Sequence, residues 1–387
     1  MTSLPSGFHC HVANIGIKDD SDDFVVLLAD GPRPASGVFT RSLFAGPSVE
    51  ISREHLADGL ACGIVVVSKN ANVANGPVGR DDALELLEIV AGRVGCDADQ
   101  LLIASTGVIG RRYPMDRVRA GARLTPAEPT GTDADAAARG IMTTDTHPKV
   151  AEASIGEGPA RVVGIAKGVG MIEPDMATMI AIVLTDADVD RATLDARFRA
   201  VVDRTFNCVS VDTDTSTSDT AVVLTSGAAG PVADDDLEAA LYGVCLALTK
   251  MIAADGEGAE TLIEVRVAGA RDDAQAKRVA KAIVNSPLVK TAVHGADPNW
   301  GRIAMAIGKC SDDTDIDQER VVIRFGVDEV YPSRVDEDGL ARLSEYLRGD
   351  EVLIDVDLGV TAGSGTAAVW GCDLTDGYVR INAEYTT

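Results

Sequence analysis

The stretch Gly164-Ile-Ala-Lys-Gly-Val-Gly-Met-Ile-Glu-Pro-Asp-Met-Ala-Thr-Met179 runs directly into the apolar segment Ile180-Ala-Ile-Val-Leu184. Two runs with strand character therefore flank a tight passage that contains glycine and proline. Thr178 stands at the start of the second run, directly after the small residue Ala177. The pattern predicts that Thr178 lies at the mouth of a buried strand, which is where a self-activating threonine would sit.

A threonine hydroxyl becomes a useful nucleophile when the chain is cut before it, because its own α-amine can then take the proton. Such an amine has a reference pKa of roughly 7.7–8.0, so part of it is neutral near pH 7. The cut itself would follow from attack of the Thr178 hydroxyl on the Ala177 carbonyl, if the glycine-rich passage strains that peptide bond. The alternative from the residues alone is an ordinary hairpin whose threonine faces a neighbour.

The chain as a whole has 387 residues and a formal net charge of −25. This length suggests two domains, and we expect a larger one over 1–275 and a smaller α/β domain over 276–387. The acidic charge disfavours nucleic acid and suits a cationic small substrate, although solubility explains most of it equally well. Without a leader-like start or an apolar run near the ~20 residues of a membrane span, we expect a cytoplasmic protein with no membrane partner.

Cysteine and metal-ligand patterns are weak. The seven cysteines show no Cys-x-x-Cys pair, which is typical of reduced, mostly buried thiols. His9-Cys10-His11 has no second ligand cluster at a suitable spacing. The calcium-like run from Asp212 has Thr217 where such a loop needs Gly and Val223 where it needs Glu. We therefore expect no metal and no organic cofactor.

Strand and helix patterns alternate along the chain. Strands are expected at Phe24–Leu28 and Gly63–Val67, and the sequence from Asp82 to Glu85 resembles a capping box before a helix. We place Trp300 and Arg302 at a bend. Further helices are expected within Leu194–Val202, Leu237–Ile252, Ala276–Val284 and Leu340–Leu347, with strands at Val209–Asp219, Leu262–Val267, Val352–Leu358 and Ala367–Cys372 and a hairpin over Val321–Val330.

Three polar clusters are candidates for a site. The apolar run Leu101–Ala104 ends in Ser105-Thr106-Gly107, where backbone N–H groups can point at one oxygen atom, although an ordinary strand exit looks the same. The hydroxyl cluster 143–146 can bind a polar ligand or form plain turns. Glu257, between two glycines, can receive a cationic amine or remain a solvated turn carboxylate.

Together these motifs resemble one family along the whole chain. Ser105-Thr-Gly-Val-Ile-Gly110, Met142-Thr-Thr-Asp-Thr146, Ala166 through Thr178, Asp255-Gly-Glu-Gly258 and Asn382-Ala-Glu-Tyr-Thr-Thr387 resemble the ornithine acetyltransferase (glutamate N-acetyltransferase) family. Because Asp175 stands beside Glu173 where many members carry Asn, the closest likeness is to members associated with clavulanic acid gene clusters.

The resemblance implies a layered α-β-β-α sandwich of the DmpA/ornithine acetyltransferase type and self-cleavage between Ala177 and Thr178. The two resulting chains, 1–177 and the rest, would stay together, commonly as α2β2. Thr178 would carry acetyl from N2-acetyl-L-ornithine to L-glutamate in arginine biosynthesis, and Thr106 with Gly107 would form the oxyanion hole. The substrate-binding positions implied are Thr144, Lys167, Thr178, Glu257, Asn382 and Thr387.

Two other hypotheses remain open at this point. The same nucleophile could pass its acyl group to water, as in an N-terminal-nucleophile aminopeptidase or amidase. An inactive paralogue would bind ligand without turnover.

Overall fold

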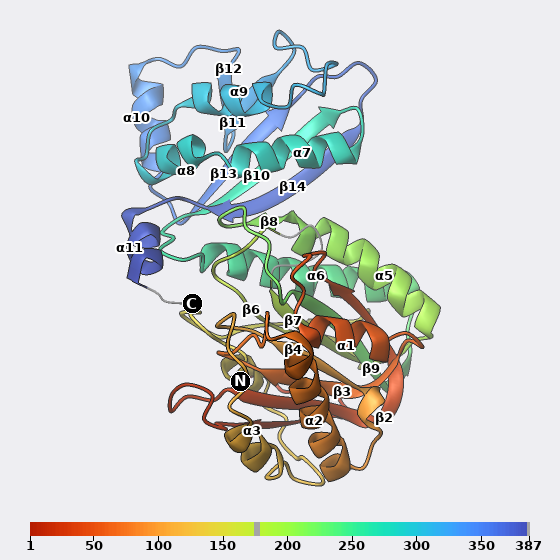
Figure 1. The fold of residues 1–387 in the computed structure, drawn as a ribbon. Coiled ribbons are helices and arrows are strands. Elements are labelled where there is room, and N and C mark those ends of the chain that lie inside the picture. The colour runs from red at the N-terminus through yellow and green to blue at the C-terminus, as the bar shows by residue number, and fades with distance from the viewer. Residues whose placement is uncertain (174–178, 385–387) are drawn as a thin grey trace.

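A computed structural model describes residues 1–173 and 179–384. The predictions for Ala177, Thr178 and Thr387 therefore lie outside the described residues. Figure 1 shows two stacked bodies, each built around its own sheet, with the short C-terminal helix beside the junction between them.

The first sheet contains β1 (Phe8–Ala13), β2 (Phe24–Phe39), β3 (Leu60–Val67), β4 (Leu101–Ser105), β5 (Lys149–Ser154), β6 (Arg161–Lys167), β7 (Ile180–Asp188) and β9 (Thr220–Pro231). Its strand order is β4-β3-β2-β9-β7-β6-β5, with β1 also paired to β2. The long strand β2 belongs to both halves, because Phe24–Leu28 pairs with β1 and β3 while Ala35–Phe39 pairs with β9. A register shift separates the two pairings, and one half of the sheet packs on the other.

Strict alternation along the strands explains this packing. Val25 and Leu27 of β2 lie in one hydrophobic core together with Ile180 and Ile182 of β7, so this core joins the two halves of the sheet. The residues between them point the opposite way, because successive strand side chains alternate faces. Val26 accordingly packs in a second core and residues 181 and 183 in a third.

Helices cover the two outer faces and complete four layers. The second core contains Leu86 and Val90 of α2, and the third contains Phe198 of α5 and Leu241 of α6. This is the α-β-β-α sandwich, so the predicted fold class is confirmed. The helices of this body are α1 (Pro47–His55), α2 (Gly76–Val94), α3 (Met115–Ala122), α4 (Ala134–Gly140), α5 (Arg191–Arg204) and α6 (Asp234–Ala254).

The second sheet has the order β12-β11-β13-β10-β14-β8, and α7 packs on β10 and β14. Its strands β8 and β10 precede residue 276; the division at 275/276 stays a prediction. The remaining elements are β8 (Val209–Ser210), β10 (Leu262–Ala270), β11 (Val322–Phe325), β12 (Asp328–Tyr331), β13 (Glu351–Asp357), β14 (Gly365–Cys372), α7 (Asp273–Val284), α8 (Pro287–His294), α9 (Trp300–Gly308), α10 (Glu337–Tyr346) and α11 (Asp376–Glu384).

Three local predictions were wrong. Asp82 caps no helix, because α2 begins at Gly76 and Asp82 lies inside it, paired with Arg112 at 2.7 Å. The strand expected over Val209–Asp219 ends at Ser210, since the following hydroxyl and carboxylate side chains bond to nearby backbone N–H groups instead. Trp300 begins helix α9 rather than a bend.

Helix α6 is also the one helix in residues 1–173 and 179–384 that is long and apolar enough to cross a membrane by length and composition. Half of its apolar window is buried inside the protein. Packing against α5, β5 and β6 accounts for its hydrophobic character, as for a core helix of a globular protein.

Candidate functional site

A pocket opens where several elements of the first sheet end. Thr106 follows β4, Lys167 ends β6, and Ile180, paired with Lys167, begins β7. The turn after α6 and helix α11 close its other side. The lining residues described are Thr106, Gly107, Ile109, Thr143, Thr144, Lys167, Val169, Gly170, Met171, Met179, Ile180, Ser216, Thr217, Ser218, Asp219, Glu257 and Asn382.

The turn Thr106–Gly107 has a demanding geometry. Gly107 has φ +125°, and a Cβ there would lie 2.2 Å from the backbone carbon of Lys69, so only glycine fits. The Thr106 N–H donates to the Val67 carbonyl at 3.1 Å, which changes the simple expectation of two amides aimed at one oxygen. Thr106 can instead contribute its hydroxyl, while the Gly107 N–H has no acceptor among residues 1–173 and 179–384.

Lys167 brings a cation beside this turn. Its Nζ donates to Thr106 Oγ1 at 3.2 Å. Because an ammonium only donates, Thr106 Oγ1 is the acceptor and its own hydrogen remains available for a different partner. Burial lowers the pKa of Lys167, the positive charge of Lys149 lowers it further, and the Asp145 carboxylate opposes both.

Glu257 places a carboxylate on the opposite wall. Its Oε1 accepts from Thr144 Oγ1 at 3.5 Å and its Oε2 from Asn382 Nδ2 at 2.9 Å. The carboxylate lies against Gly170, where any Cβ would come within 2.6 Å of it. The structure thus brings Thr144, Glu257 and Asn382 together from three distant segments.

A group of buried charges lies beneath these residues, and we call Asp145, Lys149 and Asp255 the charged floor. The side chains of Lys149 and Asp145 are fully buried and that of Asp255 is 3% exposed. Lys149 Nζ donates to Asp145 Oδ1 at 2.8 Å and to Asp255 Oδ2 at 2.5 Å. Paired in this way, the three charges avoid the penalty of an isolated buried ion.

The charged floor was missed by the sequence reasoning. The cluster 143–146 drew attention to its hydroxyls, whereas its carboxylate is the group that the fold buries. The available signal was the spacing of Asp145 and Lys149, four residues apart and with opposite charge. The pocket wall Ser216–Asp219 was likewise read as part of a strand.

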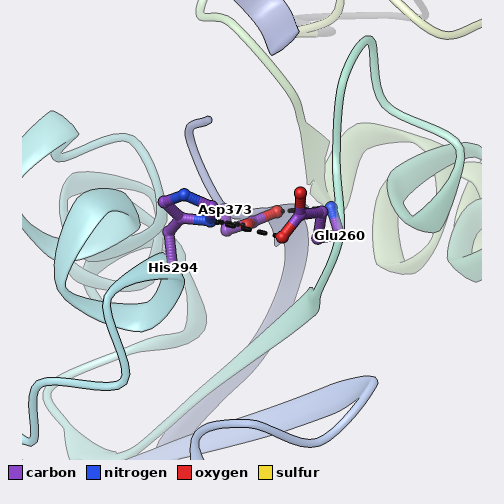
Figure 2. Close-up of side chains that lie close together, drawn as sticks. All are labelled: Glu260, His294 and Asp373. Carbon is purple, nitrogen blue, oxygen red and sulfur yellow. Dashed lines mark hydrogen bonds and ion pairs between the residues drawn. The ribbon is translucent and has the colours of Figure 1, made fainter. Parts of the chain in front are cut away.

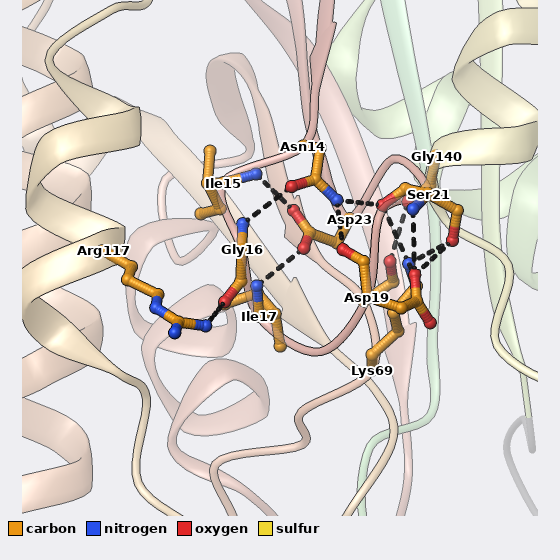
Figure 3. Close-up of polar contacts among 11 residues, drawn as sticks. Asn14, Ile15, Gly16, Ile17, Asp19, Ser21, Asp23, Lys69, Arg117 and Gly140 are labelled. Atoms are coloured by element: carbon orange, nitrogen blue, oxygen red, sulfur yellow. Dashed lines mark hydrogen bonds and ion pairs between the residues drawn. The ribbon is translucent and has the colours of Figure 1, made fainter.

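Beside the pocket lies a second hollow that shares Thr143 and Thr144 with it and is lined by Lys18–Asp22 and Lys69. We call Asn14–Asp23 the rim loop. Figure 3 shows how its polar side chains turn inward on their own backbone: Asp23 accepts from the N–H groups of Ile15 at 2.7 Å and Ile17 at 2.8 Å.

Lys69 connects the rim loop with the turn Thr106–Gly107. Its Nζ donates to Asp19 Oδ1 at 2.6 Å and to the Ser21 carbonyl at 2.9 Å (Figure 3). Lys69 itself has φ +72°, and its backbone is the surface against which Gly107 packs. One residue therefore contacts the rim loop with its side chain and the candidate site with its backbone.

Possible metal ligands lie elsewhere. His9 and His11 point to one face of β1 and Cys10 to the other, so the three side chains cannot converge. Figure 2 shows a separate cluster in which His294 Nδ1 lies 3.1 Å from Asp373 Oδ2 and 3.6 Å from Glu260 Oε2. Asp373 also accepts from the Glu260 and Thr261 N–H groups. Through the hydrogen bond between His294 and Asp373, these contacts link α8 to the residues just before β10 and just after β14.

The described lining of the pocket presents one cation, Lys167, and two carboxylates, Asp219 and Glu257, together with several hydroxyl groups. This set suits a small amino acid whose carboxylate pairs with Lys167 and whose amine pairs with Glu257. The Thr106 hydroxyl and the Gly107 N–H are donors of the kind that stabilises an oxyanion in acyl transfer.

Comparisons with known proteins agree along the whole chain. A family model described as the ArgJ family matches residues 9–387. The chain is 59% identical to the glutamate N-acetyltransferase Oat2 of Streptomyces clavuligerus, over 99% of this chain and 98% of that protein. It is 56% identical to the arginine biosynthesis bifunctional protein ArgJ 2 of Nostoc sp., over 100% of this chain and 99% of the relative.

Among solved structures, the arginine biosynthesis bifunctional protein ArgJ from Bacillus halodurans matches with a TM-score of 0.50 and 44% identity. The match covers 54% of this chain and 100% of that one.

Proposed function

This chain belongs to the ArgJ family, and from that premise we propose that it is a glutamate N-acetyltransferase that moves acetyl from N2-acetyl-L-ornithine to L-glutamate. The full-length identity to the Oat2 relative supports this activity. Relatives named for arginine biosynthesis support a role in that pathway, and we place the enzyme in the cytoplasm.

The observation that carries the proposal is the convergence of Thr106–Gly107, Lys167 and Glu257 on one pocket. Met179, the residue that follows the proposed nucleophile in the sequence, also lines it. The α-carboxylate of either amino acid would pair with Lys167 and an amine with Glu257, with Thr144 and Asn382 fixing the Glu257 carboxylate. Thr387 would complete the binding positions.

The reaction would run in two halves. The Thr178 hydroxyl attacks the acetyl carbonyl while its α-amine takes the proton, and ornithine leaves with that proton on its amine. The amine of glutamate then attacks the acetyl ester, and the threonine oxygen regains its proton. Both tetrahedral intermediates carry an oxyanion that the Thr106 hydroxyl and the Gly107 N–H would stabilise.

The α-amine in this scheme requires scission between Ala177 and Thr178. We propose that the precursor cuts itself there and that its two chains remain associated, as α2β2. No step in the scheme uses a metal or an organic cofactor.

Replacing Thr178 with Ala tests nucleophile and cleavage together. We expect one uncut chain of 40.3 kDa and no acetyl transfer, whereas a split product from this variant would contradict the scheme. Mass analysis of the denatured protein reads the first outcome, and acetyl exchange between labelled N-acetylornithine and glutamate reads the second. If free acetate forms faster than N-acetylglutamate when glutamate is present, the protein is an aminopeptidase or amidase instead.

A further inference from the structure

The charged floor accepts backbone hydrogen bonds from the two segments that carry Thr144 and Lys167. Asp145 accepts from the Thr143 N–H at 3.1 Å, beside Thr144, and from the Gly168 N–H at 2.7 Å, beside Lys167. Asp255 accepts from the Thr146 N–H at 3.2 Å. Asp145 and Asp255 therefore accept more hydrogen bonds than their ion pairs with Lys149 alone would require.

These contacts converge on the position of Lys167. Gly168, with φ +150°, directly follows Lys167 and donates its N–H to Asp145 Oδ1. The Asp145 carboxylate is thus fixed both to the backbone that carries Lys167 and to Lys149 Nζ. Movement of Asp145 would therefore move the Lys167 ammonium relative to Thr106.

We propose that Asp145 and Lys149 are positioning residues for the acyl transfer: they hold the Lys167 ammonium where it donates to Thr106 Oγ1, which leaves the hydrogen of that hydroxyl to donate to the oxyanion. This inference rests on the proposed function, because the oxyanion belongs to that reaction. The role of Lys167 then extends beyond binding a substrate carboxylate.

The orientation of the Thr106 hydroxyl follows from simple donor counting. Its oxygen accepts from Lys167, and its single hydrogen must then point to another acceptor. A hydroxyl that already accepts from a cation is also a stronger donor. Since the Thr106 N–H is bonded to Val67, the hydroxyl is the group of Thr106 left for this task.

Charge gives the two residues opposite influences on Lys167. In the described parts of the chain, the charged groups that act on Lys167 are Asp145, Lys149, Asp219 and Glu257. Asp145 raises the pKa of the Lys167 ammonium and Lys149 lowers it. A neutral Lys167 would lose the charge that strengthens the Thr106 hydroxyl as a donor, so activity should fall at alkaline pH as Lys167 deprotonates.

The test is the pH profile of kcat/KM for acetyl transfer in two variants. In D145N we expect the alkaline limb to move to lower pH, by roughly 1–3 units for a lost opposite charge in contact, and kcat/KM at neutral pH to fall about 10- to 100-fold from misplacement. In K149Q we expect the alkaline limb to move to higher pH. A purely structural role would not give shifts of opposite sign.

The matched control is D313N. Asp313 is also buried, with its side chain 5% exposed, and accepts from Arg271 and Arg278 in the body built on the second sheet. Its profile should keep the wild-type alkaline limb. Shifts of D145N and K149Q in the same direction, or no larger than those of D313N, would overturn the proposal.

Side-chain NMR titration of Lys167, assigned by its loss in K167R, gives a readout without turnover. In this titration the pKa of Lys167 should fall in D145N and rise in K149Q. A wild-type Lys167 that is already neutral at neutral pH would overturn the proposal even if neither variant folds. A wild type that titrates as expected but transfers no acetyl would refute the proposed function and leave the charge relation standing.

Discussion

Two buried lysines flank the pocket, and they are held in different ways. Lys149 in the charged floor meets two carboxylates that are themselves buried. Lys69 at the rim has a side chain only 7% exposed, but its partner Asp19 is 52% exposed. When an ion pair is broken, a buried partner stays stranded whereas an exposed partner turns to water. We therefore expect the floor to control stability and the rim to control local geometry.

The largest effect should come from Lys149→Met. The substitution leaves Asp145 and Asp255 buried without their shared cation, which typically costs about 3–5 kcal/mol. Urea unfolding measures the loss. A cost below that of the equivalent change at Lys69 would reverse the comparison.

The next largest effect should come from Gly107→Ala, where the rim backbone meets the site. The added methyl group would press on the backbone of Lys69, so the turn must move and the oxyanion donors with it. We expect kcat to fall about 10²- to 10³-fold.

The matched control for that variant is Gly110→Ala. Gly110 also has a positive φ, +79°, but nothing lies within 4 Å of its Cβ position. Its backbone strain should lower stability and leave kcat near the wild-type value. Equal losses of kcat in both variants would show that strain alone, rather than contact with Lys69, is responsible.

The acid stability of the two regions should differ as well. The pKa of Asp145 lies below its ordinary 3.8, because although burial alone would raise it, the charges of Lys167 and Lys149 and the Gly168 N–H outweigh burial. A carboxyl group whose pKa is lower in the folded than in the unfolded protein stabilises the fold at pH values above its unfolded-state pKa. This contribution is lost as the pH falls through its folded-state pKa.

We therefore expect the difference in unfolding free energy between wild type and D145N to have its largest value above pH 3.8. The difference should shrink as the pH falls below that value. Urea titrations at several acidic pH values measure it. A difference that grows on acidification would contradict the sign of this linkage.

The smallest effect should come from Lys69→Met. Methionine fills the space of the buried stem, and Asp19 is free to hydrate, so we expect a loss of at most about 1 kcal/mol. Loss of the contact with Ser21 should increase amide hydrogen exchange in the rim loop while exchange in α6 stays unchanged. A loss as large as that of Lys149→Met would show that the rim is part of the buried framework.

Local sequence patterns were sufficient for much of the fold. The apolar runs Phe24–Leu28 and Ile180–Leu184 predicted strands, and apolar residues at helical spacing predicted helices where α5 and α6 lie. The pattern misled at Asp82, where a capping signature lies within a helix because Arg112, thirty positions away, supplies the partner. It misled again after Ser210, where polar side chains bond to the nearby backbone.

What the sequence determined by itself was many of the strands and helices and the residues that form the motifs, because both depend on neighbours a few positions apart. What only the tertiary structure decided was which charges meet: Lys149 and Asp255 are 106 positions apart, and Lys167 and Thr106 are 61 apart. Local propensity carries no information about such pairs. Burial selects them, since an ion removed from water must find its partner wherever the fold places one.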